Sequence, residues 1–401
     1  MYNVGFTILM AVLCDLTFAM PNIPKINTSP EVYTLKNGIT VIVLEDHRNP
    51  AVDVGFSYRV GSIDDPGGLT GISHYLEHVM FLGTPKISKQ HFRDEVTKIT
   101  KSYNAYTTDE QTVYEFTTTP THLKRIFELQ ADRAQQLLFK RDLIENERKV
   151  VLEERAMRVD NNPWGAIYEK KTAITNISSG YHHPVIGWKH DILSITREDL
   201  INWYQTWYTG DNLTILVVGD VESKKVLALS QSYFGNLRKT FPRKRRNQIE
   251  TMYIPEVRAE IEARIKHPAF SISFKIPPFT QQTLKQECVF DILSILLGSA
   301  DGILTKRMVD EDHMFDNFSA LVHNNHWISG TFEFSGTPNK NIHFYSFKGN
   351  LLHYLSQFSE KNINKKQLQS IKNSLKASNV FNHDYLSFSA RELIWLNNGR
   401  I

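Results

Sequence analysis

The chain has 401 residues, of which 41% are hydrophobic and 22% charged, and its formal net charge is +3 at pH 7. These values are ordinary for folded globular proteins, and they exclude a fibrous or wholly disordered chain of this length, which suggests two or three domains. A net charge this small gives no reason to expect nucleic acid or an acidic membrane surface as a partner.

The N-terminal residues have the pattern of a secretory signal. Residues 4–13 form an almost unbroken apolar run, and the small residues Thr17 and Ala19 follow where signal peptidase reads a chain. The run is too short to span a bilayer comfortably. We therefore expect residues 1–19 to be removed and the mature chain to be exported, to a bacterial periplasm, without a stable transmembrane segment. The alternatives are a buried N-terminal strand or helix, and import into the mitochondrial matrix, which the absence of Arg and Lys before Lys25 disfavours.

The first half of the chain begins with predicted strands and continues with predicted helices. Residues 31–44 read as two strands joined by Asn37-Gly38, a pair suited to a tight hairpin turn. Further strands are expected at residues 51–60, 112–119 and 213–218, and helices at residues 70–82, 120–139, 141–159 and 197–208. This order predicts an α+β fold with a sheet covered by helices on one side.

A basic segment, residues 237–249, separates this region from a second one that resembles it. The segment is rich in Lys and Arg and lacks apolar periodicity, so a solvated linker is favoured over a patch that binds an anionic surface. Beyond it, residues 267–274 repeat the pattern of residues 49–56, and the helix after each strand ends in Leu-Gly. Internal duplication is the simplest account, with chance similarity as the alternative. We therefore predict two homologous domains, residues 25–236 and residues 250–401.

The segment GISHYLEHVMF, residues 71–81, contains a candidate metal site. His74 and His78 are four residues apart, so on a helix both imidazoles lie on one face and can share one Zn²⁺. Glu77 lies beside them, where it can take a proton from the attacking water. This H-x-x-E-H order is the inverzincin pattern. The bare pattern is only moderately specific, because an exposed histidine pair on a helix is ordinarily structural or solvated.

A catalytic zinc usually has three protein ligands, so a carboxylate is expected elsewhere in the chain. In the helix predicted at residues 141–159, Glu147, Val150, Val151 and Glu154 follow i, i+3, i+4, i+7 spacing, which places two carboxylates on an otherwise apolar face. Such carboxylates are costly unless they are paired or bound to a metal. The pattern favours Glu154 as the third ligand and Glu147 as a partner near the site. A helix with a charged margin would explain Glu147 alone, but it explains the pair less well.

Several segments, all in one order, resemble the pitrilysin and insulinase family of zinc peptidases, in particular its single-chain bacterial branch, which is similar to the mitochondrial processing peptidase subunits. The matching segments are LKNGITVIVLED (residues 35–46), GGLTGISHYLEHVMFLGT (67–84), NAYTTDEQTVYEF (104–116), ERKVVLEERAMRVDNNPWG (147–165), HHPVIGW (182–188) and VVGDV (217–221). Spaced segments in one order are much more specific than the zinc motif alone. The resemblance implies that His74, His78 and Glu154 hold Zn²⁺. It also implies that the catalytic carboxylates are Glu77, as general base, and Glu147 beside the ligands.

The resemblance also implies an edge strand that binds the backbone of a peptide substrate by β-strand addition. Asn104 and Ala105 would lie on this strand, and an ordinary turn residue is an equal alternative for Asn104. Tyr114 could be either a site residue or an aromatic residue of the strand core. These three residues are the candidate substrate-binding residues.

The fold that the resemblance implies is a pair of tandem α+β domains, each a mostly antiparallel sheet covered by helices, which face each other as a clamshell around a peptide chamber. Aligned on the Leu-Gly endings, His74, Glu77 and His78 of the first copy correspond to Val289, Ile292 and Leu293 in the second. Only the first domain would therefore hold zinc.

The second half departs from the family pattern in two places. The family often has an Arg and a Tyr that grip the substrate, but here residues 309–320 read VDEDHMFDNFSA, with Asp316 near the place of the Tyr and Arg307 as an uncertain substitute for the Arg. The sequence also ends at Ile401, soon after a helix predicted at residues 365–377. These departures predict a truncated second domain and activity that is reduced or depends on a partner chain.

The sequence thus predicts a zinc-dependent endopeptidase that hydrolyses peptides or unfolded polypeptide segments. The rival hypothesis is a catalytically weak or inactive scaffold or regulatory subunit that partners an active homologue. A presequence-processing peptidase of the mitochondrial matrix is a second rival. The resemblance implies a homodimer, or a heterodimer with a zinc-less relative, and no nucleic acid is expected as a partner.

Overall fold

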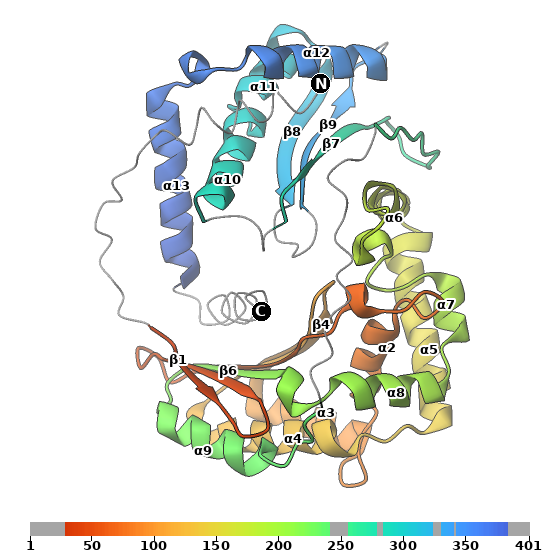
Figure 1. The fold of residues 1–401 in the computed structure, drawn as a ribbon, viewed down its shortest axis with the longest axis vertical. Coiled ribbons are helices and arrows are strands. Elements are labelled where there is room, and N and C mark those ends of the chain that lie inside the picture. Colours follow the sequence, from red (N-terminus) through yellow and green to blue (C-terminus); the bar gives the residue numbers. More distant parts are fainter. Residues whose placement is uncertain (1–28, 241–255, 279–283, 324–329, 341, 384–401) are drawn as a thin grey trace. The chain divides into compact units, whose positions relative to one another are not determined.

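The computed structural model describes residues 29–240, 256–278, 284–323, 330–340 and 342–383. The predicted signal segment and most of the basic segment lie outside these residues. The chain divides into two compact units, and among the described residues the first runs to Thr240 and the second from Glu256 to Phe381 (Figure 1). Each unit combines a largely antiparallel sheet with helices, so the predicted fold class of two tandem α+β domains is confirmed.

The first unit is built on a six-stranded sheet with the order β1-β2-β6-β3-β5-β4. Its strands are β1 (Glu31–Thr34), β2 (Thr40–Glu45), β3 (Val52–Tyr58), β4 (Thr100–Thr107), β5 (Thr112–Thr118) and β6 (Leu213–Gly219). β2 and β6 pair in parallel, and the other neighbouring strands pair antiparallel. The hairpin between β1 and β2 turns at Gly38, whose φ of 92° is a value that glycine adopts without steric cost. β4 lies at the edge of the sheet and pairs with β5.

Helices follow the strands of this unit. They are α2 (Ile72–Val79), α3 (Lys89–Ile99), α4 (Leu123–Gln136), α5 (Arg141–Arg155), α6 (Pro163–Thr175), α7 (Lys189–Ser194), α8 (Arg197–Trp207) and α9 (Ser223–Phe234). α3, α4 and α9 lie along one face of the sheet (Figure 1). On that face the rings of Phe127 and Phe234 each lie 5.5 Å from the ring of Phe56 on β3. The opposite face of the sheet is also apolar and buried, as Ile42 and Leu216 show, so β2 and β6 read as unbroken apolar runs.

The predicted elements of the first unit are confirmed, with shifted ends. The helix predicted at residues 141–159 is α5 followed by a π-helical turn, Ala156–Asp160. The sequence pattern did not predict α3, α6, α7 and α9.

The basic linker begins later than predicted. Leu237 is buried in the core of the first unit, and the guanidinium of Arg238 donates a hydrogen bond to the backbone carbonyl of Tyr204.

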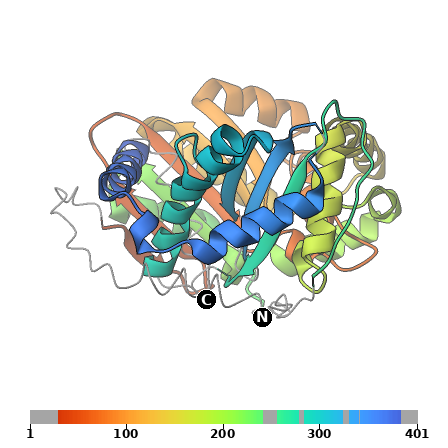
Figure 2. The ribbon, with the colours of Figure 1, turned by 90° about the horizontal axis from the view of Figure 1, so that it is seen from above.

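The second unit has a three-stranded antiparallel sheet with the order β7-β9-β8. Its elements are β7 (Phe270–Ile276), α10 (Leu284–Gly298), α11 (Ile303–Thr305), a π-helical turn (Lys306–Glu311), β8 (Phe315–His323), β9 (Gly330–Pro338), α12 (Phe344–Gln357) and α13 (Lys365–His383). α12 crosses the end of the sheet where β7 and β8 begin (Figure 2), and Phe347 there meets the rings of Phe270 and Phe315. Val289 and Leu293, at two of the positions that match the zinc ligands, are buried in this core.

One helical stretch of the second unit, Gln286–Glu311, is long and apolar enough to cross a membrane by length and composition. A core helix passes the same test. Phe290, Leu293, Leu297 and Met308 of this stretch lie in the buried core beside the strands of the unit. The contacts of the stretch are therefore those of a core helix.

We predict that Leu293→Ala destabilises the second unit by about 2–5 kcal/mol, because it leaves a cavity at a fully buried position. The zinc content of the first unit should not change, because the two cores are separate clusters. Leu321→Ala is the matched control, since Leu321 is 50% exposed on β8. The check is differential scanning calorimetry with zinc analysis; equal effects of the two substitutions would contradict this description of the core.

Candidate metal centre

Helix α2 carries His74, Glu77 and His78, and its N-terminus is fixed by Asp65. The Asp65 carboxylate accepts hydrogen bonds from the backbone N–H of Gly71, at 2.8 Å, and from the hydroxyl of Ser73, at 2.6 Å. Gly71 has a φ of 85°, and a Cβ there would lie 2.4 Å from the carbonyl oxygen of Ile186. Glycine is therefore required at this position, and an acidic group lies at the helix end where the dipole favours it.

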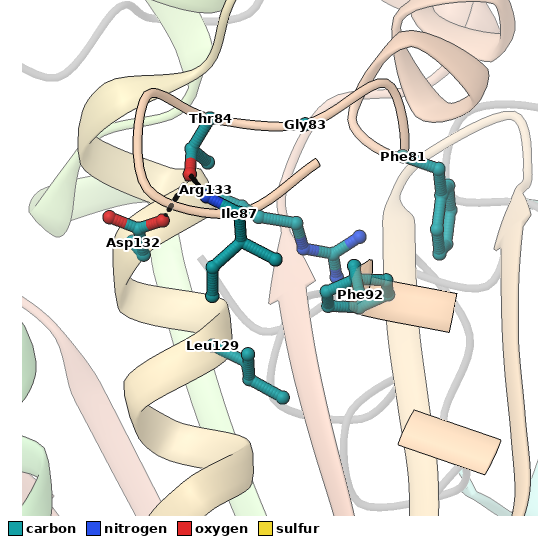
Figure 3. A pocket seen from close by; sticks show the side chains of 8 residues that line it. All are labelled: Phe81, Gly83, Thr84, Ile87, Phe92, Leu129, Asp132 and Arg133. Atoms are coloured by element: carbon teal, nitrogen blue, oxygen red, sulfur yellow. Dashed lines mark hydrogen bonds between the residues drawn. The ribbon is translucent and has the colours of Figure 1, made fainter. Parts of the chain in front are cut away.

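A buried cation, Arg133 of α4, lies at the C-terminal end of α2. Its guanidinium carbon is 4.6 Å from the ring centroid of Phe81, 4.3 Å from that of Phe92 and 5.2 Å from that of Tyr114. One guanidinium nitrogen lies 3.4 Å from the carbonyl oxygen of Met80, the residue that caps α2. Figure 3 shows Arg133 with Phe81 and Phe92, and the hydrogen bond from Thr84 to Asp132 beside them. The cation suits the negative end of the helix dipole.

The two histidines lie one turn apart with their rings close together. Their ring centroids are 4.9 Å apart and the ring planes are 70° to one another. His74 is buried and His78 is partly exposed. The i, i+4 spacing therefore brings the two imidazoles together on one face of α2, as predicted from the sequence.

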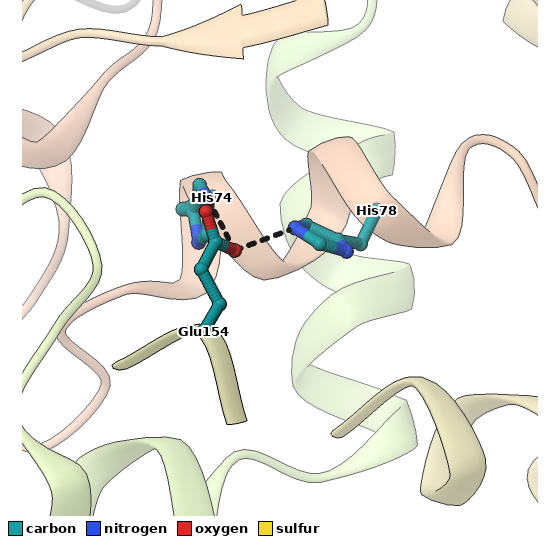
Figure 4. Close-up of side chains that lie close together, drawn as sticks. All are labelled: His74, His78 and Glu154. Carbon is teal, nitrogen blue, oxygen red and sulfur yellow. Dashed lines mark ion pairs between the residues drawn. The ribbon is translucent and has the colours of Figure 1, made fainter. Parts of the chain in front are cut away.

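Glu154, at the end of α5, completes the group (Figure 4). Its Oε2 lies 3.5 Å from Nε2 of His74 and 3.2 Å from Nε2 of His78. This oxygen is buried and has no hydrogen-bond partner among the described residues. The other carboxylate oxygen, Oε1, lies 2.7 Å from the guanidinium of Arg158, one turn further along.

Glu147 lies behind His78, on the side away from Glu154. Its Oε1 is 3.0 Å from Nδ1 of His78, and its Oε2 is 2.8 Å from the ammonium of Lys89 at the start of α3. When Nδ1–H donates to this carboxylate, Nε2 carries the lone pair and faces Glu154, which is how a metal-binding histidine is commonly oriented. The spacing prediction therefore places both carboxylates correctly. The same spacing also predicted that Val150 lies on a buried apolar face, and this prediction is wrong because Val150 is 44% exposed.

Glu77 is buried beside the histidines and takes no part in the cluster with Glu154. The hydroxyl of Thr107, the last residue of β4, donates a hydrogen bond of 2.7 Å to its Oε2. Burial raises the pKa of Glu77, and the hydrogen bond from Thr107 opposes that shift.

The ligand candidates differ strongly in protonation. Burial and the neighbouring His78 lower the pKa of His74 to about 3. Burial also acts to lower the pKa of His78, but the adjacent Glu147 and Glu154 carboxylates outweigh it and raise this pKa to about 9. Burial acts to raise the pKa of Glu154, but the two histidines and Arg158 lower it to about 2. At neutral pH His74 is therefore neutral, His78 protonated and Glu154 ionised.

These residues fit a zinc ion. The three candidate ligand atoms, one each from His74, His78 and Glu154, all lie within 4.8 Å of one another. Two imidazole nitrogens and one carboxylate oxygen are a donor set of catalytic zinc, which keeps a further position open. The buried Glu154 oxygen without a hydrogen-bond partner is the atom that such an ion would satisfy.

The predicted substrate-binding residues divide into two kinds. Asn104 is exposed and Ala105 half-buried, and both lie on the edge strand β4. Tyr114 is fully buried in β5 and shares a hydrogen bond of 2.8 Å with the hydroxyl of Tyr208. Tyr114 therefore has no exposed surface that a substrate could contact in this structure. Of the two alternatives for Tyr114, the structure matches the aromatic residue of the strand core.

Three residues of the site were missed in the sequence: Lys89, Thr107 and Arg158. Lys89 and Thr107 come from other elements and have no fixed spacing from the histidine motif. Arg158 had a usable signal, because it follows Glu154 at i+4, where a cation and a carboxylate meet on a helix.

Two family models match the chain. "Insulinase (Peptidase family M16)" matches residues 40–184, and "Peptidase M16 inactive domain" matches residues 194–375. The zinc protease PqqE of Helicobacter pylori is 28% identical over 386 residues, 94% of this chain and 84% of that protein. The mitochondrial-processing peptidase subunit beta of Lentinula edodes is 30% identical over 207 residues, 52% of this chain and 44% of that subunit. The chain thus matches less than half the length of the latter relative.

Solved structures give the same likeness. A protease from Helicobacter pylori has a TM-score of 0.83 at 27% identity, and the match covers 92% of this chain and 90% of that chain. The first half of the periplasmic protease PqqL from Escherichia coli has a TM-score of 0.74 at 17% identity, covering 95% of this chain and 84% of that one. The second match is a likeness of fold.

We predict that the apparent zinc affinity rises about tenfold per pH unit between about pH 6 and pH 9, because a metal must displace the proton from His78, whose pKa is about 9. His74 and Glu154 need lose no proton in this range. Calorimetry in buffers of different ionisation enthalpy should therefore record release of about one proton per zinc at neutral pH. Affinity that is flat across this range would contradict the assignment of His78.

We also predict that Glu147→Gln weakens zinc binding by about 10- to 100-fold, because it removes the charge that orients His78 and pairs with Lys89. Glu145→Gln is the control, since Glu145 lies on the same helix and pairs with Arg148 away from the histidines. Competition with a chelating dye measures both. Equal zinc affinity of the two variants would show that Glu147 does not orient His78.

Proposed function

The chain belongs to the insulinase family of peptidases, family M16, and from this premise we propose that it is a zinc-dependent endopeptidase that hydrolyses peptides or unfolded polypeptide segments. The similarity to proteins named zinc proteases supports a peptidase. The observation that carries the proposal is the convergence of Nε2 of His74, Nε2 of His78 and Oε2 of Glu154, with a further carboxylate, Glu77, next to them on α2.

In this proposal His74, His78 and Glu154 hold the metal, and Glu77 is the general base. Bound zinc would supply a Lewis acid that polarises a peptide carbonyl and lowers the pKa of water. Glu77 takes the proton from the attacking water. Its burial supports this role, because a raised pKa makes the carboxylate a better proton acceptor near neutral pH.

Glu147 and Lys89 act on the metal site through His78. Because the Glu147 carboxylate accepts from Nδ1 of His78, it keeps Nε2 directed at Glu154. Lys89 neutralises the second oxygen of that carboxylate and holds it in place. The pair therefore stabilises the orientation of one ligand and needs no contact with the substrate.

We propose that the substrate binds along β4 in an extended conformation. β4 pairs with β5 and is the last strand in the order of its sheet, so one side of it can accept another strand. Asn104 and Ala105 lie on this strand, in register with Glu115 and Tyr114 of β5. The main-chain groups of β4 would then bind the peptide irrespective of its sequence.

The alternative is a weakly active or inactive subunit, and one observation favours it. Arg307, the candidate substrate-gripping residue of the second unit, is paired with Glu311 and lies 3.3 Å from Asp312. It also lies over the ring of Tyr354. A guanidinium with these partners within its own unit is less available to a peptide.

We further propose that the chain is exported, and the apolar run at residues 4–13 supports this. We also propose that a weakly active or inactive subunit would act as part of a dimer.

Glu77→Gln is expected to retain zinc and to lower turnover by about 10²- to 10⁴-fold, because it removes the base and leaves the three ligands. Glu153→Gln is the matched control, since Glu153 is exposed beside Glu154 on α5. Both are compared with the unchanged chain on a mixed pool of unstructured peptides, with zinc measured in each sample.

Three outcomes decide between the candidate functions. Zinc binding with hydrolysis that depends on Glu77 supports the endopeptidase. Zinc binding without hydrolysis supports the partner-dependent subunit. Hydrolysis that survives in Glu77→Gln rules out the proposed base.

A further inference from the structure

We propose that Thr107 is a positioning residue for the Glu77 carboxylate: its hydroxyl holds Oε2, so that Oε1 keeps one fixed direction. The inference rests on the proposed function, because it takes Glu77 as the general base. Among the described residues the Thr107 side chain makes no hydrogen bond to any of the three candidate metal ligands, so its effect should be separable from metal binding.

The hydrogen-bond pattern around Thr107 leaves its proton for Glu77. The Thr107 hydroxyl lies 2.7 Å from Oε2 of Glu77 and 3.5 Å from the hydroxyl of Thr112. Thr112 already donates its own proton to the backbone carbonyl of Val60, at 2.9 Å. A hydroxyl has one proton to give, and the shorter contact to an acceptor that carries charge when ionised takes it.

Thr107 is the sole hydrogen-bond donor to Glu77 among the residues that the structure describes. Glu77 as a whole residue is 8% exposed, so few water molecules can replace this bond. The terminal torsion of a glutamate is broad and weakly restrained by itself. The direction of the two oxygens therefore depends on the donor.

The position of Thr107 is fixed through the same segment that fixes α2. The turn after β4 is bonded to the loop before α2, because the N–H groups of Ser62 and Ile63 donate to the carbonyls of Thr108 and Asp109. The hydroxyl of Ser73, in the first turn of α2, lies 3.2 Å from the carbonyl oxygen of Gly61. The end of β4 and the helix that carries Glu77 are thus tied to one short loop.

The threonine side chain suits this role better than a more flexible one. Its branched Cβ restricts χ1, so in a strand the hydroxyl has few directions available. Valine has the same shape without the hydroxyl, and serine keeps the hydroxyl without the methyl group. The two substitutions therefore separate the hydrogen bond from the packing.

The test compares Thr107→Val, Thr107→Ser and Thr117→Val in the full chain. Thr117 is the matched control, because its hydroxyl donates to the Asp53 carboxylate at the other end of the β5 pairing. We expect Thr107→Val to lower kcat by about tenfold or more with KM within about twofold, since a misdirected base slows the chemical step more than binding. Zinc content should be unchanged, Thr107→Ser should recover most of kcat, and Thr117→Val should leave kcat unchanged.

A spectroscopic measurement on the metal-free protein tests the bond itself. The infrared difference between the unchanged chain and Glu77→Gln isolates the carboxyl bands of Glu77. Thr107→Val should shift these bands, and Thr107→Ser and Thr117→Val should leave them in place. In the Glu77→Gln background, Thr107→Val should cause no further loss of kcat, because the base is already absent.

The inference is overturned if Thr107→Val keeps the kcat of the unchanged chain, leaves the Glu77 bands in place, loses zinc, or is matched in its loss of kcat by Thr117→Val. It is also overturned if Thr107→Ser is as inactive as Thr107→Val. In each of these cases a Glu77→Gln variant without turnover leaves the proposed function standing. Turnover that survives in Glu77→Gln removes the proposed function instead.

Discussion

Helix α2 buries the imidazole of His74 and the carboxylate of Glu77 in the first unit, and it half-buries the imidazole of His78 beside them. The surrounding structure has to offset the electrostatic cost of removing these groups from water. A buried ionisable group is tolerated when neighbouring groups compensate for the lost water. Glu77 is compensated by Thr107 from β4, His78 by Glu147 from α5, and Glu147 in turn by Lys89 from α3. Each partner comes from a different element, so the site and the packing of β4, α3 and α5 against α2 depend on one another.

Much of this arrangement is local in sequence and could therefore be predicted. The i, i+4 spacing of His74 and His78 fixes their mutual position once α2 forms, and the i, i+7 spacing of Glu147 and Glu154 does the same on α5. Most strands of the first unit and the helices α2, α4, α5 and α8 were predicted for the same reason, because their periodicity extends over a few consecutive turns or residue pairs. The sequence pattern did not predict α6 and α9, which are of similar length, and β4 was expected only from the family resemblance. Nothing local specifies Thr107, which reaches the site through strand pairing and the turn that follows.

The errors have the same physical origin. Helical periodicity placed Val150 on the buried face of α5, but the packing of neighbouring helices leaves it 44% exposed. Tyr114 lies on β5 as predicted, but its side chain points into the core. There it contacts the hydroxyl of Tyr208 and the guanidinium of Arg133. Leu237 was predicted to lie in a solvated linker, and it is instead buried in the core of the first unit. Burial is decided by tertiary neighbours that a sequence pattern does not name.

The position of the ligands on two separate helices has a consequence for the durability of the chain. His78 and Glu154 lie on α2 and α5, so an ion held between them would act as a removable cross-link that closes a long loop of the first unit. Any ligand that binds only the folded form stabilises it by mass action. In the second unit the positions that align with His74 and His78 are the buried Val289 and Leu293. This unit would therefore gain no direct stabilisation from the metal. Metal supply would then set the lifetime of one half of the molecule against proteolysis, while the lifetime of the other half depends on its aromatic core.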